Sequence, residues 1–181
     1  MSVIMNDTIN TILERRTVRA YKQRPLTGDE LDTLLAAADW APSARNAQQV
    51  FARIVDSKAI LDEINAEFWK TVTPGAKPYS RCETNPFYQN APTVFFLYSE
   101  NESYTDTGIL AQNIMLAAKS IGLGSCPIGS VCGFLNSDDG KSVKNLLKIP
   151  ENDIITLLVA VGEPDEEPEK KDRRSGKFEV L

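Results

Sequence analysis

The chain has 181 residues, 42% of them hydrophobic and 25% charged, and its formal net charge is −5. This length and composition are typical of one globular domain with a buried core, and an acidic chain is not expected to bind nucleic acid. No apolar run reaches the ~20 residues of a membrane span, and residues 1–11 lack the basic and apolar regions of a secretory signal, so we expect a cytoplasmic protein.

The first predicted helix has Asp7 as its N-cap and ends near Arg15 or Arg16, where an extended segment follows. Arg15, Arg16 and Arg19 lie close along the chain, with the hydroxyl of Thr17 between them. Guanidinium groups and a hydroxyl together bind phosphate oxygens, but arginines in a last helical turn also suit the helix dipole. Two interpretations therefore remain open: a site for one small anion, or a solvated helix end.

A capping box of Thr27 and Glu30 predicts a second helix, and an apolar run predicts a strand over residues 50–55. The polar loop between them, residues 41–49, mixes hydrogen-bond donors and acceptors that suit the edge of a planar heterocycle. A loop of this kind can also be a simple connection. Its polar residues include Ser43, Arg45, Asn46 and Gln48.

Ser57 predicts the start of a third helix, and the residues after it, 71–92, show no regular pattern. A loop of about twenty residues in a compact domain usually forms a lid, a binding loop or a mobile segment. Tyr79, Phe87 and Tyr88 are candidates for the aromatic residues of such a lid. The other interpretation is that these three side chains fill the core from outside.

A continuous apolar run over residues 93–98 predicts a central strand covered on both faces. Residues 106–121 form the strongest helical pattern, apolar on most of its circumference and therefore buried, with Gly122 as its C-cap. The glycines that follow do not form a dinucleotide motif, because Pro127 takes the place of the third glycine. We expect instead a loop over residues 122–130, with backbone amides around Gly129 and Ser130 that can bind a ligand.

Ser137 predicts a short helix that Pro150 terminates, and residues 153–161 predict a third apolar strand. An acidic tail follows, and its basic cluster at residues 170–174 can be read as a solvated terminus. The three cysteines predict neither a disulfide framework nor a metal site. The chain has no histidine, which excludes imidazole catalysis, so a bound cofactor is expected to supply any difficult chemistry.

In this order and spacing, the segments resemble the flavin-dependent nitroreductase family over nearly the whole chain. The matching motifs are residues 15–21, 41–48, 122–125 with 127–129, and 161–164 with 171–173. The resemblance implies a nitroreductase-like α+β fold, with a central mixed or antiparallel sheet flanked by helices. It also implies a single FMN-binding domain over residues 1–181 and an intertwined homodimer. Residues 165–181 would extend toward the partner, with a terminal strand at 178–180 that adds to the partner's sheet.

The resemblance further implies how this chain would hold FMN. Arg15, Thr17, Lys171 and Arg173 would bind the phosphate and the ribityl chain, and Arg16 would support the same region. Arg19 and the backbone amide of Gly129 would act in catalysis, the first at the pyrimidine edge of the flavin and the second at N5. A fixed cation at that edge stabilises the negative charge of the reduced flavin. The remaining contacts would come from the other subunit's Pro42, Ser43, Ala44 and Asn46, and from Pro127, Ile128, Gly129 and Ser130 over the ring.

The implied activity is an FMN-dependent transfer of hydride from NADH or NADPH to a small organic acceptor, such as a nitroaromatic compound or a quinone, by a ping-pong mechanism. No acid–base side chain is required. The alternatives are a flavin dehalogenase or oxidase with a dedicated substrate, a non-catalytic FMN storage or sensor protein, and a phosphoanion-binding module without flavin. We expect no nucleic acid, membrane or metal among its partners.

Overall fold

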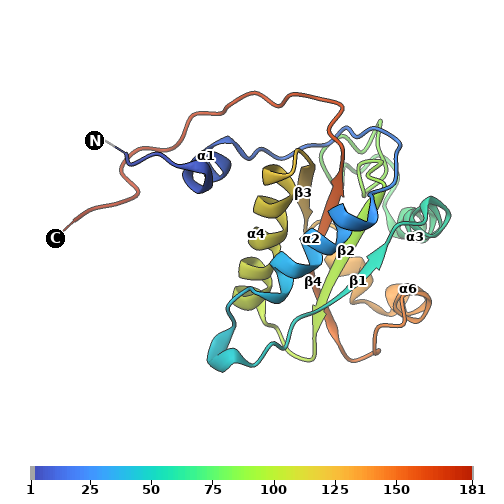
Figure 1. The fold of residues 1–181 in the computed structure, drawn as a ribbon. Coiled ribbons are helices and arrows are strands. Elements are labelled where there is room, and N and C mark those ends of the chain that lie inside the picture. The colour runs from blue at the N-terminus through green and yellow to red at the C-terminus, as the bar shows by residue number, and fades with distance from the viewer. Residues whose placement is uncertain (1–2, 181) are drawn as a thin grey trace.

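The computed structural model describes residues 3–180, which form an α+β fold around one antiparallel sheet (Figure 1). The strands are β1 (Phe51–Val55), β2 (Thr93–Ser99), β3 (Gly124–Ile128) and β4 (Ile154–Gly162), in the order β1-β2-β4-β3. The predicted α+β class and the strands predicted at residues 50–55, 93–98 and 153–161 are confirmed. Residues 1, 2 and 181, at the ends of the expected domain, lie outside the described part.

Helices cover both faces of this sheet. They are α2 (Gly28–Asp39), α3 (Lys58–Thr71), α4 (Tyr104–Ser120), α5 (Cys132–Leu135) and α6 (Lys141–Leu146), whereas α1 (Asp7–Glu14) lies off the sheet, beside α4 (Figure 1). On one face, Leu34 of α2 and Ile114 of α4 belong to the same apolar cluster as Phe95 of β2. On the other face, α3, α5 and α6 pack with Phe96. Because successive strand residues point to opposite faces, β2 is buried over its whole length.

Within residues 3–180, the longest helices are too short or too polar to cross a bilayer. The ends of the helices follow local signals. Thr27 forms the predicted capping box. The C-cap of α4 is Ile121 and not the predicted Gly122, which follows it with a φ of +83° and ends the helix. The prediction of Asp7 as an N-cap is wrong, because the side chain of Asn6 accepts the Ile9 N–H at 2.9 Å. Asp7 is the first helical residue instead, where its negative charge still suits the helix dipole.

The segment predicted as a loop over residues 122–130 is largely strand β3, so that prediction is wrong. β3 lies at the edge of the sheet and pairs with β4. An edge position tolerates Pro127, whose missing N–H would break a central strand. Gly124 is required for close packing, because a Cβ there would lie 2.8 Å from Cγ2 of Val18. Gly124 and Pro127 are typical of an irregular segment. In this fold Pro127 lies in an edge strand and Gly124 allows close contact with Val18.

The irregular segment, residues 72–92, contributes to the core. Phe87 and Tyr88 are 0% and 1% exposed, which confirms that they fill the core. Tyr79 is half-buried, and its ring centre lies 6.1 Å from those of Phe68 and Trp69 in α3. Aromatic packing therefore anchors this segment on the α3 side of the sheet.

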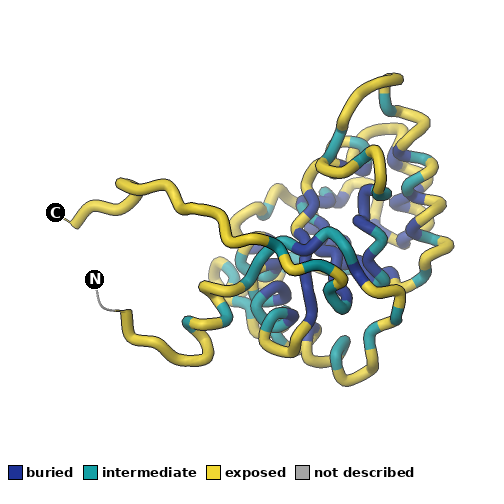
Figure 2. Tube along the Cα trace, turned by 90° about the horizontal axis from the view of Figure 1, so that it is seen from above, coloured by how far each residue is buried: buried dark blue, intermediate teal, exposed yellow. Residues whose placement is uncertain are grey.

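Both ends of the described chain extend from the same side of the body and are largely exposed (Figure 2). None of the residues of α1 is buried, and its Ile12 and Leu13 side chains are exposed. Phe178 and Val180 are 91% and 99% exposed, and residues 178–180 form no strand within this chain. The terminal strand stays a prediction, since its pairing requires a second chain.

We predict that Gly162→Ala destabilises the fold, because the new Cβ would lie 2.5 Å from Cδ of Pro92 in a packed strand. The expected loss is about 1–3 kcal/mol in the free energy of unfolding, measured by urea denaturation at fixed protein concentration. Gly28→Ala is the matched control: it has open space around its Cβ, and its effect should stay within about 0.5 kcal/mol. Equal stability of the two variants would contradict the packing argument.

Candidate functional site

The arginine cluster follows α1 and lies against the edge strand β3. Arg15 is the C-cap of α1, and Thr17 forms a parallel bridge with Ser125. The N–H of Val18 donates to the carbonyl of Ser125 at 3.0 Å. Pairing with β3 fixes this part of the backbone. A cleft of about 690 Å³ opens beside it. The charged residues of its lining are Arg15, Arg16, Lys119 and Lys170 together with Glu14, Glu166, Glu167 and Glu169.

Among residues 3–180, no carboxylate pairs with the guanidinium groups of this cluster. Nη1 of Arg15 is buried and makes no hydrogen bond within the described residues. Over the same residues, 3–180, none of Arg15, Arg16 and Arg19 forms an ion pair. Burial, followed by the nearby charges of Arg16 and Arg173, lowers the pKa of Arg15. A partly buried cation that lies near like charges is stabilised when an anion binds to it.

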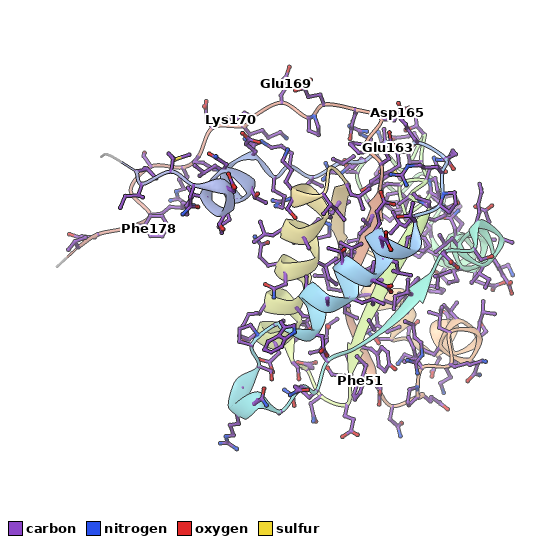
Figure 3. All side chains as sticks on the ribbon, in the orientation of Figure 1. Phe51, Glu163, Asp165, Glu169, Lys170 and Phe178 are labelled. Carbon is purple, nitrogen blue, oxygen red and sulfur yellow. The ribbon has the colours of Figure 1, made fainter. Side chains whose placement is uncertain are left out.

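The C-terminal tail runs over this cleft (Figure 3). An antiparallel bridge at Pro164 fixes its start. Lys170 lines the cleft, and Arg173 lies near enough to lower the pKa of Arg15. Lys171 is exposed. Arg173 is exposed as well, so of these two predicted residues only Arg173 acts on the cluster, through its charge.

The hydrogen bonds that fix Arg19 involve its backbone N–H and carbonyl and not its guanidinium. Its N–H donates to Oε1 of Glu166 at 2.5 Å, and its carbonyl accepts from Nδ2 of Asn85 at 2.9 Å. The second carboxylate oxygen of Glu166 accepts from Nη2 of Arg81 at 2.8 Å. The sequence alone did not predict that Glu166, Asn85 and Arg81 contribute to the site. Glu166 lies within an acidic run, where no spacing distinguishes it from its neighbours.

Cys126 of β3 lies beside this network. Burial raises the pKa of its thiol to about 11, and the charges of Arg19, Glu166 and Arg81 also act on it. A thiol with that pKa is not a nucleophile at neutral pH.

Four residues at the end of β3 are expected over the flavin ring. Ile128 is buried, whereas Pro127, Gly129 and Ser130 are exposed.

A buried carboxylate fixes the polar loop, residues 41–49. Asp106, in the first turn of α4, accepts the N–H of Ala44 with both oxygens at 3.3 Å. It also accepts from Nε2 of Gln49 at 3.2 Å. Ser43 adds a contact inside the loop, where its hydroxyl accepts the N–H of Gln48 at 3.0 Å.

The backbone of this loop is unusual. Arg45, Asn46 and Gln48 have φ angles of +57°, +55° and +49°, a region that residues other than glycine rarely adopt. A simple connection does not require such a conformation, and strained loops cluster at binding sites. A second cleft, of about 600 Å³, adjoins the loop, and its lining includes Pro42, Ser43, Phe51 and Leu110.

The two groups of predicted site residues lie at opposite ends of α4. Asp106 holds the loop at the start of this helix, and Gly122 lines the arginine cleft just beyond its end. α4 has 17 residues, so the two ends are about 25 Å apart. In Figure 3, Phe51, beside the loop, and Lys170, beside the arginines, lie at opposite ends of the molecule. One chain therefore does not bring Pro42, Ser43, Ala44 and Asn46 to the cluster of Arg15, Arg16, Thr17 and Arg19.

Comparisons with known proteins agree on one family. The sequence model described as "Nitroreductase family" matches residues 12–163. An NADPH-flavin oxidoreductase of Vibrio harveyi is 35% identical, over 93% of this chain and 70% of that protein. A crystal structure of a nitroreductase with bound FMN from Bacteroides fragilis has a TM-score of 0.87 at 26% identity, and the match covers 98% of this chain and 100% of that one. For an FMN-dependent nitroreductase from Clostridium difficile, the TM-score is 0.84 at 28% identity, with 97% and 99% covered.

We predict that inorganic phosphate stabilises the flavin-free protein more than chloride does at equal ionic strength, because Arg15 has a buried, unpaired donor. At about ten times its Kd, phosphate should add about 1.4 kcal/mol and raise Tm by roughly 3–6 °C. Arg15→Ala should remove this difference. Arg174→Ala, which removes the same charge from the exposed tail, should keep it. An equal response of both variants in thermal unfolding would contradict a specific anion site.

Proposed function

The chain belongs to the nitroreductase family, and on that premise we propose that it is an FMN-dependent oxidoreductase. It takes reducing equivalents from NADH or NADPH and passes them to a small organic acceptor, such as a nitroaromatic compound or a quinone. One observation carries this proposal: the buried, unpaired Nη1 of Arg15 in a cleft shared with Arg16 and the tail. An anionic cofactor would supply the acceptor that this donor lacks.

The residues of the arginine cleft fit the phosphate end of FMN. A phosphate monoester presents several acceptor oxygens, and guanidinium groups bind such oxygens in pairs. Arg15, Arg16, Lys119 and Lys170 line the cleft, and the charge of Arg173 acts on Arg15. Thr17 and Lys171 are chain neighbours of these lining residues and would have to turn toward the phosphate. Four glutamates also line this cleft, so the preference for an anion rests on the unpaired donor of Arg15 and not on an excess of positive charge.

Arg19 would act on the ring of the bound cofactor. FMN, when bound, supplies the redox chemistry, because the flavin accepts hydride from the nicotinamide and returns electrons to the acceptor. The contribution of the chain is a fixed positive charge beside the position where the ring becomes negative. Arg19 fits this role because its guanidinium has no carboxylate partner among residues 3–180 and its backbone is held at both polar groups.

A homodimer would complete the site. The loop that carries Ser43 and Asn46 lies about 25 Å from the arginines of its own chain, so a second copy, antiparallel to the first along α4, would bring it to them. The exposed apolar residues of α1 and the exposed Phe178 and Val180 of the tail are consistent with a partner contact. Residues 165–181 would form the extension toward that partner.

The visible spectrum of the purified protein tests this proposal. We expect a yellow protein that holds FMN and bleaches when NADH or NADPH is added without oxygen. A yellow protein that neither NADH nor NADPH bleaches would favour a storage or sensor protein over an oxidoreductase. A colourless protein that does not take up added FMN would contradict the proposal and favour a phosphoanion-binding module. Turnover with nitroaromatic, quinone and halogenated acceptors would then separate a reductase from a dehalogenase.

A further inference from the structure

The backbone of Arg19 depends on side chains from distant parts of the chain. The residues on either side of Arg19 form hydrogen bonds with backbone groups. The N–H of Val18 donates to the carbonyl of Ser125, and the carbonyl of Ala20 accepts from the N–H of Asp165. At Arg19 itself, both polar groups of the backbone bind side chains. The partners are the carboxylate of Glu166 and the amide of Asn85, which lie 147 and 66 positions away along the chain.

We propose that Glu166 and Asn85 are positioning residues for Arg19, and that Glu166 couples Arg19 to the irregular segment, residues 72–92, through Arg81. This inference rests on the proposed function, because Arg19 would act on a bound flavin. It adds two residues, Glu166 and Asn85, whose hydrogen bonds fix the backbone from which the Arg19 side chain extends.

Glu166 is suited to hold two partners at once. Its Oε1 accepts the N–H of Arg19, and its Oε2 accepts from the guanidinium of Arg81 at 2.8 Å. Its side chain is 21% exposed. Burial opposes ionisation of this carboxyl, but the Arg19 N–H and the Arg81 guanidinium outweigh it and lower the pKa of Glu166. An ionised carboxylate accepts a stronger hydrogen bond from a backbone N–H than a neutral acceptor does.

The irregular segment supplies the other contacts from a single turn. Arg81 has a φ of +64°, and its carbonyl accepts the N–H of Thr84 at 3.1 Å and of Asn85 at 2.8 Å. This turn brings the side chain of Arg81 to Glu166 and the side chain of Asn85 to the carbonyl of Arg19. The hydroxyl of Tyr79 donates to the carbonyl of Asn85 at 2.9 Å, which joins the turn to the aromatic packing on α3.

The position of the Arg19 guanidinium determines how strongly it would stabilise a reduced flavin. A guanidinium stabilises developing negative charge only when it is already placed where that charge forms. The side chain of Arg19 has no ion pair of its own among residues 3–180, so its direction depends on how well the backbone beneath it is fixed. Movement of residues 72–92, or of the tail at Glu166, would therefore change the effect of Arg19 on the flavin.

Four variants test this arrangement. Glu166→Ala removes both contacts, whereas Glu166→Gln keeps one oxygen for the Arg19 N–H and loses the ion pair with Arg81. Asn85→Asp is nearly isosteric and removes the donor to the Arg19 carbonyl. Glu167→Ala is the control, because it removes the same charge one position away from an exposed residue.

The first readout is amide hydrogen exchange of the flavin-free protein. Glu166→Ala should speed exchange in the peptides that cover residues 17–21 and 79–90. Glu166→Gln should speed exchange mainly in residues 79–90, Asn85→Asp mainly in residues 17–21, and Glu167→Ala in neither. Exchange in Glu166→Ala equal to that in Glu167→Ala would overturn the proposal, and this outcome does not depend on whether the protein binds FMN.

The second readout compares FMN affinity with the rate of flavin reduction by the effective nicotinamide donor. In Glu166→Ala the rate should fall roughly tenfold to a hundredfold, because a small misplacement of a positioned group has an effect of that size. FMN affinity should change less than about threefold, since the phosphate contacts remain. Equal losses of affinity and rate would overturn the positioning role. Failure of the wild-type protein to bind FMN would contradict the proposed function instead.

Discussion

The length of the helix α4 is the constraint on which the candidate site depends. Its apolar residues pack against β2 and β4, and they keep the helix straight across the face of the sheet (Figure 1). The arginine cleft lies at one end of this helix and the polar loop at the other. A rigid element of 17 residues does not let both ends reach one small ligand. The proposed homodimer follows from this separation, together with the exposed apolar residues of α1 and the tail.

Two carboxylates near the candidate site accept hydrogen bonds from backbone N–H groups and form no ion pair with the arginines of the cleft. Glu166 accepts the N–H of Arg19, and Asp106 accepts the N–H of Ala44. Each fixes a segment that the proposed function places against FMN. The guanidinium groups of Arg15, Arg16 and Arg19 form no ion pairs within residues 3–180. Glutamates also line the arginine cleft, so its affinity for an anion would come from the unpaired donor of Arg15 and not from a positive net charge.

Much of the fold could be predicted from the sequence, because strong local patterns agree with it. The apolar run of β2 predicted a buried strand correctly. The apolar pattern of α4 predicted the helix correctly, but only one side of it is buried within this chain. β3 could not be predicted, since Pro127 and Gly124 oppose a strand locally and only the edge position and the contact with Val18 explain them. The arginines of the site were visible as a cluster. Glu166 and Asn85 were not, because their role comes from contacts across the fold that no spacing along the chain records.

A mixing experiment tests the two-chain site most directly. Arg15→Ala damages the arginine end, and Asn46→Gly damages the loop end while it tolerates the positive φ of that residue. Each variant alone should bind FMN weakly. After subunit exchange, a mixed dimer has one site with both defects and one site with none, so random mixing should restore tight FMN binding at about a quarter of the sites. No recovery in mixtures that form mixed dimers would contradict a site shared between two chains.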